Sequence, residues 1–179
     1  IDRSRGLGDV YKRQPKLILQ VVTGASALLD RFGRVDDLIR KDGFQPDYSF
    51  HNIVEGETPS TMSKSTGLGV IEMSMILENL KPDQLIVVGD RFEVMAVTIA
   101  AAYMNICIVH TMGGEISGTI DESIRHAITK FAHIHFPANE DAKKRIIKLG
   151  ENPEFVYNFG CQRMDLVKEE LTNDSSALL

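Results

Sequence analysis

The sequence predicts an α/β fold, in which a parallel β-sheet carries helices on both of its faces. Short runs of apolar and β-branched residues, each of strand length, alternate along the chain with longer segments whose apolar residues recur at helical spacing. The strand-like runs are continuously apolar rather than alternating, which is typical of strands that are buried on both sides. With 179 residues and 43% hydrophobic content, the chain is long enough for one domain with a buried core.

The first half of the chain begins with a segment that does not fit this pattern. Residues 1–14 are polar, charged and aperiodic, so we expect them to be foreign to the domain or disordered. Strands are predicted from Leu17 to Val22 and, with a weaker pattern, from Tyr48 to Ile53. A long helix is predicted to start at Thr58-Pro59, because proline is favoured at the first helical position. Short helical segments are also predicted at 28–32 and 35–40.

The second half of the chain alternates between strands and helices more regularly. Asn139 is predicted to cap one of its helices and Gly150 to end it, as these residue types commonly do. The predicted strands cover residues 85–88, 106–109, 133–137 and 155–159. The predicted helices cover residues 92–104, a segment that begins at Ile120, and residues 139–149 and 162–171.

Polar residues gather where two of these strands end. Asp90 and Arg91 follow the strand at 85–88, and a glycine-containing loop with Glu115 follows the strand at 106–109. The helix after that loop carries four more titratable residues in its first two turns. These are Asp121, Glu122, Arg125 and His126. Because open α/β sheets bind ligands beyond the carboxyl ends of their strands, we predict a binding or catalytic site at this edge.

A simpler interpretation of these charges stays open. Asp121 and Glu122 are acids in a first helical turn, where they interact favourably with the helix dipole, and Arg125 lies at the spacing of an ion-pair partner. Asp90 is also a suitable cap for the helix that follows it. Gly113 and Gly114 are explained less well in this way, since consecutive glycines let a backbone approach a ligand and direct N–H groups at an anion.

The overall composition excludes several classes of function. The formal charge is −5 with acids and bases interspersed, so the chain has no basic surface for nucleic acid or membrane. Cys107 and Cys161 lack the spacing of a metal site or disulfide framework, which favours a reducing cytoplasm. His133 and His135 could begin a metal site, but no third ligand at suitable spacing accompanies them. We therefore expect no metal and no cofactor.

Two segments carry a resemblance to a known family. Residues 87–93, Val-Val-Gly-Asp-Arg-Phe-Glu, and residues 113–130, from Gly-Gly-Glu to Ile-Thr-Lys, resemble the hydrolysing UDP-N-acetylglucosamine 2-epimerases of sialic-type (nonulosonic) acid biosynthesis. The likeness extends from about Leu17 to the end of the chain.

The resemblance implies a fold and a domain arrangement. Similar enzymes have two Rossmann-like domains facing across a cleft, the GT-B type of architecture, and form dimers or tetramers. Residues 15–171 would be the N-terminal domain without its first strand, and residues 172–179 would be a truncated tail that leads to an absent C-terminal domain. We expect such a fragment to be inactive alone.

The resemblance also implies roles for individual residues. Asp90 and Asp121 match acidic positions that act as base or acid, and Arg125 matches an arginine that orients Asp121 or contacts the substrate. Glu115 completes the Gly-Gly-Glu motif and is predicted to be catalytic. The implied substrate is UDP-N-acetylglucosamine (UDP-GlcNAc), with further contacts from residues that follow the two strands. These are Arg91, Gly113, Gly114, Glu122 and His126.

One position departs from the family pattern. Many relatives carry a catalytic glutamate where this chain has Met112, and methionine cannot transfer a proton. Either Glu115 takes that role, or another acid does, or the enzyme acts on a related nucleotide sugar. A non-hydrolysing 2-epimerase, a two-domain glycosyltransferase and a non-catalytic binding module are the alternatives from other classes.

Overall fold

The computed structural model describes residues 17–56, 58–161 and 163–168. The chain divides after Pro82 into two compact units, each of which combines parallel strands with helices. The α/β class predicted from the sequence is confirmed. The predicted segments 1–14 and 172–179 lie outside the described residues.

The first unit contains a pair of parallel strands, β1 (Val22–Gly24) and β2 (Tyr48–Phe50). Both are shorter than predicted, and β1 begins at the end of the predicted apolar run. Asp47 explains where β1 begins, because its carboxylate accepts the N–H of Val21 at 2.6 Å while its own N–H donates to the Val21 carbonyl. Gly24 lies so close to the ring of Phe50 that an added Cβ would approach it to 2.4 Å.

Helices surround this strand pair along the chain. The predicted segment around 28–32 forms two 3-10 helices, Ala25–Leu28 and Asp30–Phe32, rather than one α-helix, and it ends at Gly33 as expected. The segment 35–40 forms α2 (Val35–Lys41). The predicted long helix is α3 (Pro59–Leu80), which begins with a capping box between Thr58 and Thr61.

Helix α3 buries Met73, Ile76 and Leu77 but also a polar residue. Ile71 and Met75 are exposed, whereas Ser65 is almost fully buried. The burial of Ser65 has a polar reason: its hydroxyl accepts the N–H of Val54 at 2.8 Å, and its carbonyl accepts the amide of Asn52 at 3.1 Å. These bonds tie the helix to the segment that follows β2.

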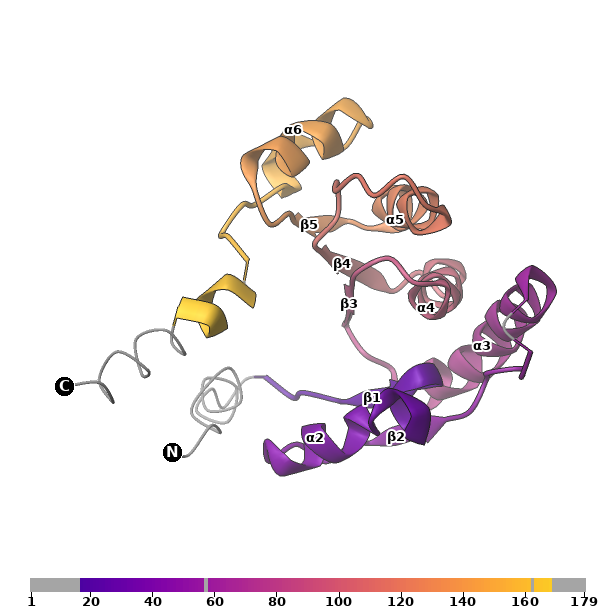
Figure 1. The fold of residues 1–179 in the computed structure, drawn as a ribbon. Coiled ribbons are helices and arrows are strands. Elements are labelled where there is room, and N and C mark those ends of the chain that lie inside the picture. The colour runs from indigo at the N-terminus through magenta and orange to yellow at the C-terminus, as the bar shows by residue number, and fades with distance from the viewer. Residues whose placement is uncertain (1–16, 57, 162, 169–179) are drawn as a thin grey trace. The chain divides into compact units, whose positions relative to one another are not determined.

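The second unit contains the sheet that carries the candidate site. Its strands are β3 (Gln84–Val88), β4 (Cys107–Thr111) and β5 (Ile134–Phe136), all parallel and in the order β3-β4-β5. Helices α4 (Phe92–Tyr103) and α5 (Ile120–Phe131) lie on the same face of this sheet (Figure 1). Ile108 and Ile128 are fully buried, as the apolar pattern of the strand and the helix predicts.

Helix α6 (Glu140–Lys148) follows β5, and its start confirms the sequence prediction. Asn139 caps it by accepting the N–H of Ala142 at 2.9 Å, and Gly150 follows its end with a φ of 97°. This cap places α6 next to the loop that leaves β4, a position that matters for the site below.

The predicted last strand, residues 155–159, is wrong for most of its length. Pro153 starts a 3-10 helix, Pro153–Phe155, so Phe155 is not extended, and only Val156 bridges to His135 of β5. Residues 163–168 are helical, in agreement with the prediction, whereas the remaining residues of that predicted helix lie outside the described residues.

Candidate active site

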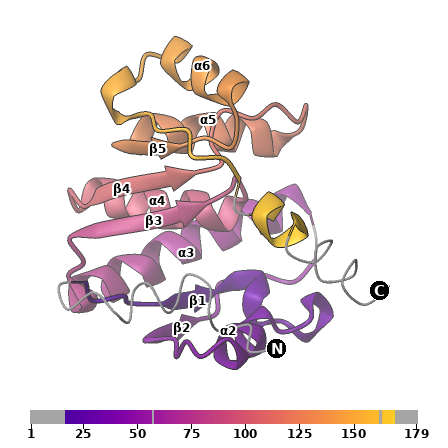
Figure 2. The same ribbon diagram turned by 90° about the vertical axis from the view of Figure 1, so that its left-hand side faces the viewer.

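The loops after β3 and β4 emerge at the same edge of the sheet. Figure 2 shows the arrows of β3 and β4 pointing the same way, toward the turns that lead to α4 and α5. Gly89, with a φ of 84°, turns the chain after β3 and places Asp90 at this edge. The longer loop from Met112 to Thr119 follows β4. The structure therefore brings the predicted site residues of both loops together.

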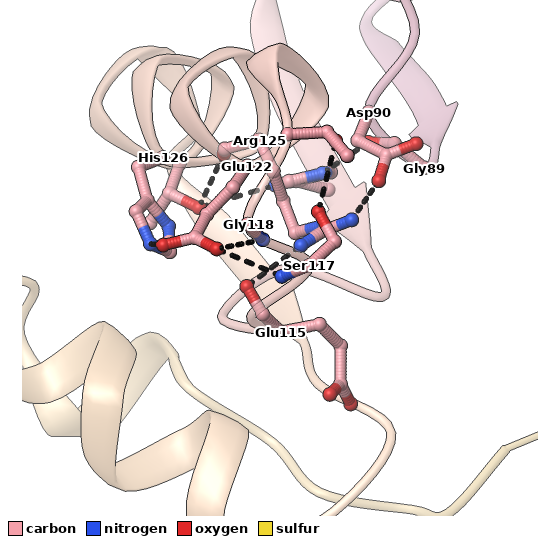
Figure 3. A network of polar contacts seen from close by, with 11 residues as sticks. Gly89, Asp90, Glu115, Ser117, Gly118, Glu122, Arg125 and His126 are labelled. Atoms are coloured by element: carbon pink, nitrogen blue, oxygen red, sulfur yellow. Dashed lines mark hydrogen bonds and ion pairs between the residues drawn. The ribbon is translucent and has the colours of Figure 1, made fainter.

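Arg125 joins the two loops. Its Nη2 forms an ion pair with the Asp90 carboxylate, and its Nη1 donates to the backbone carbonyl of Glu115 at 2.7 Å (Figure 3). The residue is only 7% exposed, and burial lowers the pKa of its guanidinium, which nonetheless stays charged. One buried cation thus fixes the positions of a carboxylate from one loop and a carbonyl from the other.

The structure excludes one of the two interpretations of Asp90. The helix after Asp90 has Arg91 at its N-cap and no side-chain cap, so Asp90 does not serve as the cap. Arg91 itself is exposed and pairs with Glu93 at 3.1 Å. The cluster centred on Arg125 therefore includes Asp90 but not the side chain of Arg91.

Glu122, which was predicted to contact the substrate, instead stabilises the loop that precedes its helix. Its Oε2 accepts the N–H groups of Ser117 at 2.8 Å and Gly118 at 2.7 Å (Figure 3). These two hydrogen bonds, with the Gly118 bond the larger cause, lower the pKa of Glu122. His126 lies beside it, with Nε2 3.9 Å from Glu122 Oε1. Glu122 is therefore engaged with the backbone of the loop that precedes α5.

Asp121 differs from its neighbour in having no such partner. It is half-buried, and it forms no hydrogen bond or ion pair with any residue that the structure describes. Arg125, the partner proposed by helical spacing, is instead turned to Asp90. Asp121 is thus a carboxylate of the site that is not committed to a structural contact.

Glu115 has two hydrogen-bond partners, one for its backbone carbonyl and one for its carboxylate. Its carbonyl accepts from Arg125, while its Oε1 accepts from Nδ2 of Asn139 at 2.7 Å. Figure 3 shows the carboxylate directed away from the Asp90–Arg125 pair. Asn139 is a residue that the sequence analysis identified only as a helix cap.

Gly113 and Gly114 are required by close packing. A Cβ on Gly113 would lie 3.0 Å from Nδ1 of His110, and one on Gly114 would lie 2.4 Å from the carbonyl oxygen of Ala142. Gly114 also has a φ of 80°, and its own carbonyl accepts from Arg145 of α6. The structure thus gives both glycines a packing reason besides the predicted approach to a ligand.

His110 is a buried residue whose role the sequence analysis did not assign. It is fully buried at the end of β4, and its Nε2 donates to the carbonyl of Gly89 at 2.9 Å. Its ring also supports Gly113, and Oγ1 of Thr129 lies 3.5 Å from Nδ1. Burial lowers the pKa of His110 to about 4, so the imidazole is neutral at pH 7. The sequence signal was a histidine inside an otherwise apolar strand.

The two histidines considered for a metal site have other partners. Nδ1 of His133 accepts the N–H of Ile108 at 3.1 Å, and Nε2 of buried His135 lies 3.4 Å from Glu151. Across residues 17–56, 58–161 and 163–168, no group of three or more His, Cys, Asp or Glu is arranged to hold a metal ion. In the same part of the chain, no helix is both long and apolar enough to cross a membrane.

Comparison with sequence families gives one match over nearly the whole chain. A family model described as UDP-N-acetylglucosamine 2-epimerase matches residues 10–178. A Legionella pneumophila UDP-N,N'-diacetylbacillosamine 2-epimerase (hydrolyzing) is 40% identical over 114 residues, which are 64% of this chain and 30% of that protein. A Campylobacter jejuni GDP/UDP-N,N'-diacetylbacillosamine 2-epimerase (hydrolyzing) is 33% identical over 92% of this chain and 43% of its own length.

A Neisseria meningitidis UDP-N-acetylglucosamine 2-epimerase is 31% identical over 87% of this chain and 41% of its own length. The chain therefore spans less than half the length of these relatives. Among solved structures, a UDP-N-acetylglucosamine 2-epimerase superposes with a TM-score of 0.72 at 21% identity, covering 83% of this chain and 41% of that one. The N. meningitidis enzyme bound to UDP-GlcNAc gives 0.70 at 19% identity, covering 83% and 40%. The structural likeness confirms the fold class.

Proposed function

This chain belongs to the UDP-N-acetylglucosamine 2-epimerase family, and we propose that it is the N-terminal catalytic domain of a hydrolysing member. The reaction would convert UDP-GlcNAc into N-acetylmannosamine and UDP, with inversion at C2 of the sugar. The observation that supports this proposal is the set of three acids, Asp90, Glu115 and Asp121, at one sheet edge around the buried Arg125. The relatives from L. pneumophila and C. jejuni, whose names include "hydrolyzing", support the hydrolytic outcome.

The chemistry explains why several carboxylates are needed. The proton at C2 is not adjacent to a carbonyl, so its direct removal would be very slow. When the C1–O bond to UDP breaks, positive charge develops at C1, and a carboxylate can then take the C2 proton and leave a double bond between C1 and C2. Water adds to C1, and a second acid delivers a proton to C2 from the other face. The products are N-acetylmannosamine and UDP.

The environments of the three acids suggest different roles. Asp121 has no polar partner among the residues that the structure describes, so it is available to exchange a proton with the substrate. Asp90 is held as a carboxylate by Arg125, which orients it and favours its charged form. Glu115, held apart by Asn139, occupies a separate position. We propose that proton removal and proton delivery use different members of this set.

The remaining predicted residues take supporting roles in this proposal. Glu122 keeps the loop from Ser117 to Thr119 in place, with His126 beside it. The backbone of Gly113 and Gly114 and the exposed Arg91 are proposed to contact the substrate. We also propose that a second domain completes the nucleotide site, because the matched relatives are more than twice as long as this chain.

The test uses the full-length gene product and deuterated water. Incubation with UDP-GlcNAc should release free N-acetylmannosamine that carries deuterium at C2, as seen by proton NMR. A product that is still linked to UDP would instead indicate a non-hydrolysing epimerase. The 179-residue chain, tested alone, should give no turnover if the second domain is required.

A second candidate substrate is supported by the sequence comparison. The L. pneumophila relative, at 40% identity over its matched segment, is named for UDP-N,N'-diacetylbacillosamine. The same elimination and hydration chemistry applies to that sugar, because it also has a hydrogen at C2 and a nucleotide at C1. Parallel incubations with the two nucleotide sugars, compared by kcat/KM, distinguish the candidates.

A further inference from the structure

The side chain of Asn139, which lies outside the Asp90–Arg125 pair, makes two hydrogen bonds that matter for the site. Oδ1 of Asn139 caps α6 by accepting the N–H of Ala142 at 2.9 Å, and Nδ2 of the same side chain donates to Oε1 of Glu115 at 2.7 Å. The cap fixes the orientation of the amide, because the N–H of Ala142 requires an oxygen. The amide nitrogen is consequently the atom that faces the Glu115 carboxylate.

Helix α6 also holds the backbone of the same loop. Arg145 donates to the carbonyl of Gly114, and Gly114 packs against Ala142 and Ile146 too closely for any side chain of its own. Both Ala142 and Ile146 are fully buried. The loop backbone is therefore fixed to α6, and within the described residues the Asn139 amide is the only hydrogen-bond partner of the Glu115 carboxylate.

We propose that Asn139 is a positioning residue that holds the Glu115 carboxylate in one orientation for the reaction. This inference rests on the proposed function, in which Glu115 exchanges a proton. A hydrogen bond donated to a carboxylate favours its charged form, and a fixed orientation lowers the entropic cost of reaching the transition state. The Glu115 carboxylate is directed away from Asp90, so Asn139 and not Arg125 sets its orientation.

Two substitutions separate this role from capping. Asn139→Asp keeps an oxygen for the Ala142 N–H, so α6 stays capped, but it places a second carboxylate against Glu115. We expect kcat to fall by about tenfold or more and the pH profile to move to higher pH, with little change in KM. Asn139→Ser also preserves a cap but only removes the donor, so its effect on kcat should be smaller and its pH profile less displaced.

Asn152 provides a matched control. It caps the 3-10 helix Pro153–Phe155 through Oδ1, which accepts the N–H of Glu154 at 3.1 Å, and it forms no bond to a proposed site residue. Asn152→Asp makes the same chemical change at a cap and should leave kcat and the pH profile unchanged.

The double variant Glu115→Gln with Asn139→Asp tests the contact without using activity. It exchanges the donor and acceptor, so the repulsion in Asn139→Asp becomes a hydrogen bond again. We expect Asn139→Asp to lower the midpoint of thermal unfolding by about 2–4 °C and the double variant to recover it. Activity should not recover, because glutamine cannot transfer a proton.

The outcomes separate this inference from the proposed function. If the wild-type enzyme releases N-acetylmannosamine while Asn139→Asp and Asn139→Ser keep its kcat and pH profile, Asn139 is only a helix cap and the inference is overturned. Failure of the double variant to recover its unfolding midpoint also overturns it. If the wild-type enzyme releases no product, the proposed function fails, and the unfolding data alone show whether Asn139 holds Glu115.

Discussion

The loops after β3 and β4 meet at one sheet edge but are held there in different ways. The loop after β3 is short, and its acid, Asp90, depends on a single side chain, Arg125. The loop from Met112 to Thr119 is longer and is held from α5 by Arg125 and Glu122 and from α6 by three separate contacts. Arg125 is the contact that both loops share. The position of the Asp90 carboxylate thus depends on one buried cation, whereas the longer loop is held by several independent contacts.

The largest effect should follow removal of the shared cation. Arg125→Met would leave Asp90 without its partner at a partly buried position and should destabilise the protein by about 3–5 kcal/mol. Arg145→Met removes only a contact to the loop after β4 and should cost about 1.5 kcal/mol. Urea unfolding of both variants checks the order. Equal losses would contradict the idea that Arg125 serves two loops.

His110 contacts both loops, because its ring bonds to the Gly89 carbonyl and lies against Gly113. Its protonation should therefore destabilise both loops. Burial lowers its pKa from 6.5 to about 4, so the unfolded chain binds a proton at a higher pH than the folded protein does. The free energy of unfolding therefore has its full value above about pH 6.5 and should fall by about 3 kcal/mol as the pH drops to about 4. Chemical unfolding across this range measures the slope.

His110→Gln provides the control for this prediction. Its amide nitrogen can still donate to the Gly89 carbonyl, but it does not titrate. The pH slope should become shallower without vanishing, because burial also lowers the pKa of His135. An unchanged slope would show that His110 does not titrate in this range.

Alanine substitutions at two glycines test how tightly each loop is packed. Gly89 and Gly114 have nearly the same φ, 84° and 80°, but an added Cβ meets nothing within 4 Å at Gly89 and the Ala142 carbonyl at 2.4 Å at Gly114. Gly89→Ala should cost only the backbone strain, about 1 kcal/mol. Gly114→Ala should cost about 1–3 kcal/mol more because of the clash. Thermal unfolding of the pair gives the difference directly.

The smallest and most local effect is expected at Glu122. Glu122→Gln weakens the acceptor for the Ser117 and Gly118 amides, so these two amides should exchange hydrogen faster in NMR while that of Gly89, in the other loop, should not change. Because the pKa of Glu122 is lowered, its two hydrogen bonds stabilise the loop at pH values above the usual pKa range of a glutamate. This stabilisation is lost as the pH falls below that range. Equal exchange in variant and wild type would show that the loop does not depend on Glu122.

The sequence predicted the elements that are defined by neighbouring residues, but it predicted contacts between distant segments less accurately. The caps at Thr58 and Asn139 and the strands β3 and β4 follow from neighbouring residues, and the structure confirms them. The strand predicted at 155–159 was wrong because Pro153 starts a 3-10 helix there.

The sequence predicted that these polar residues gather at one sheet edge, and the structure places them there, but their partners differ from those expected. Helical spacing suggested that Arg125 pairs with Asp121, four residues away, whereas it pairs with Asp90 in the loop after β3. The contact between Asn139 and Glu115 likewise joins residues that are 24 positions apart. Such pairs depend on how parallel strands are aligned and on where helices pack, and no local pattern in the sequence contains that information.

The central proposal is that the carboxylates at this edge, Asp121 among them, carry out the epimerisation. Its most direct test is deuterium incorporation at C2 of N-acetylmannosamine by the full-length gene product, comparing wild type with Asp121→Asn and Asp141→Asn. Asp141 lies at the same position in the first turn of α6 and is exposed, so it is a matched control. The account predicts that Asp121→Asn lowers the rate by about a hundredfold or more without loss of stability, while Asp141→Asn matches wild type. A wild-type rate in Asp121→Asn would contradict it.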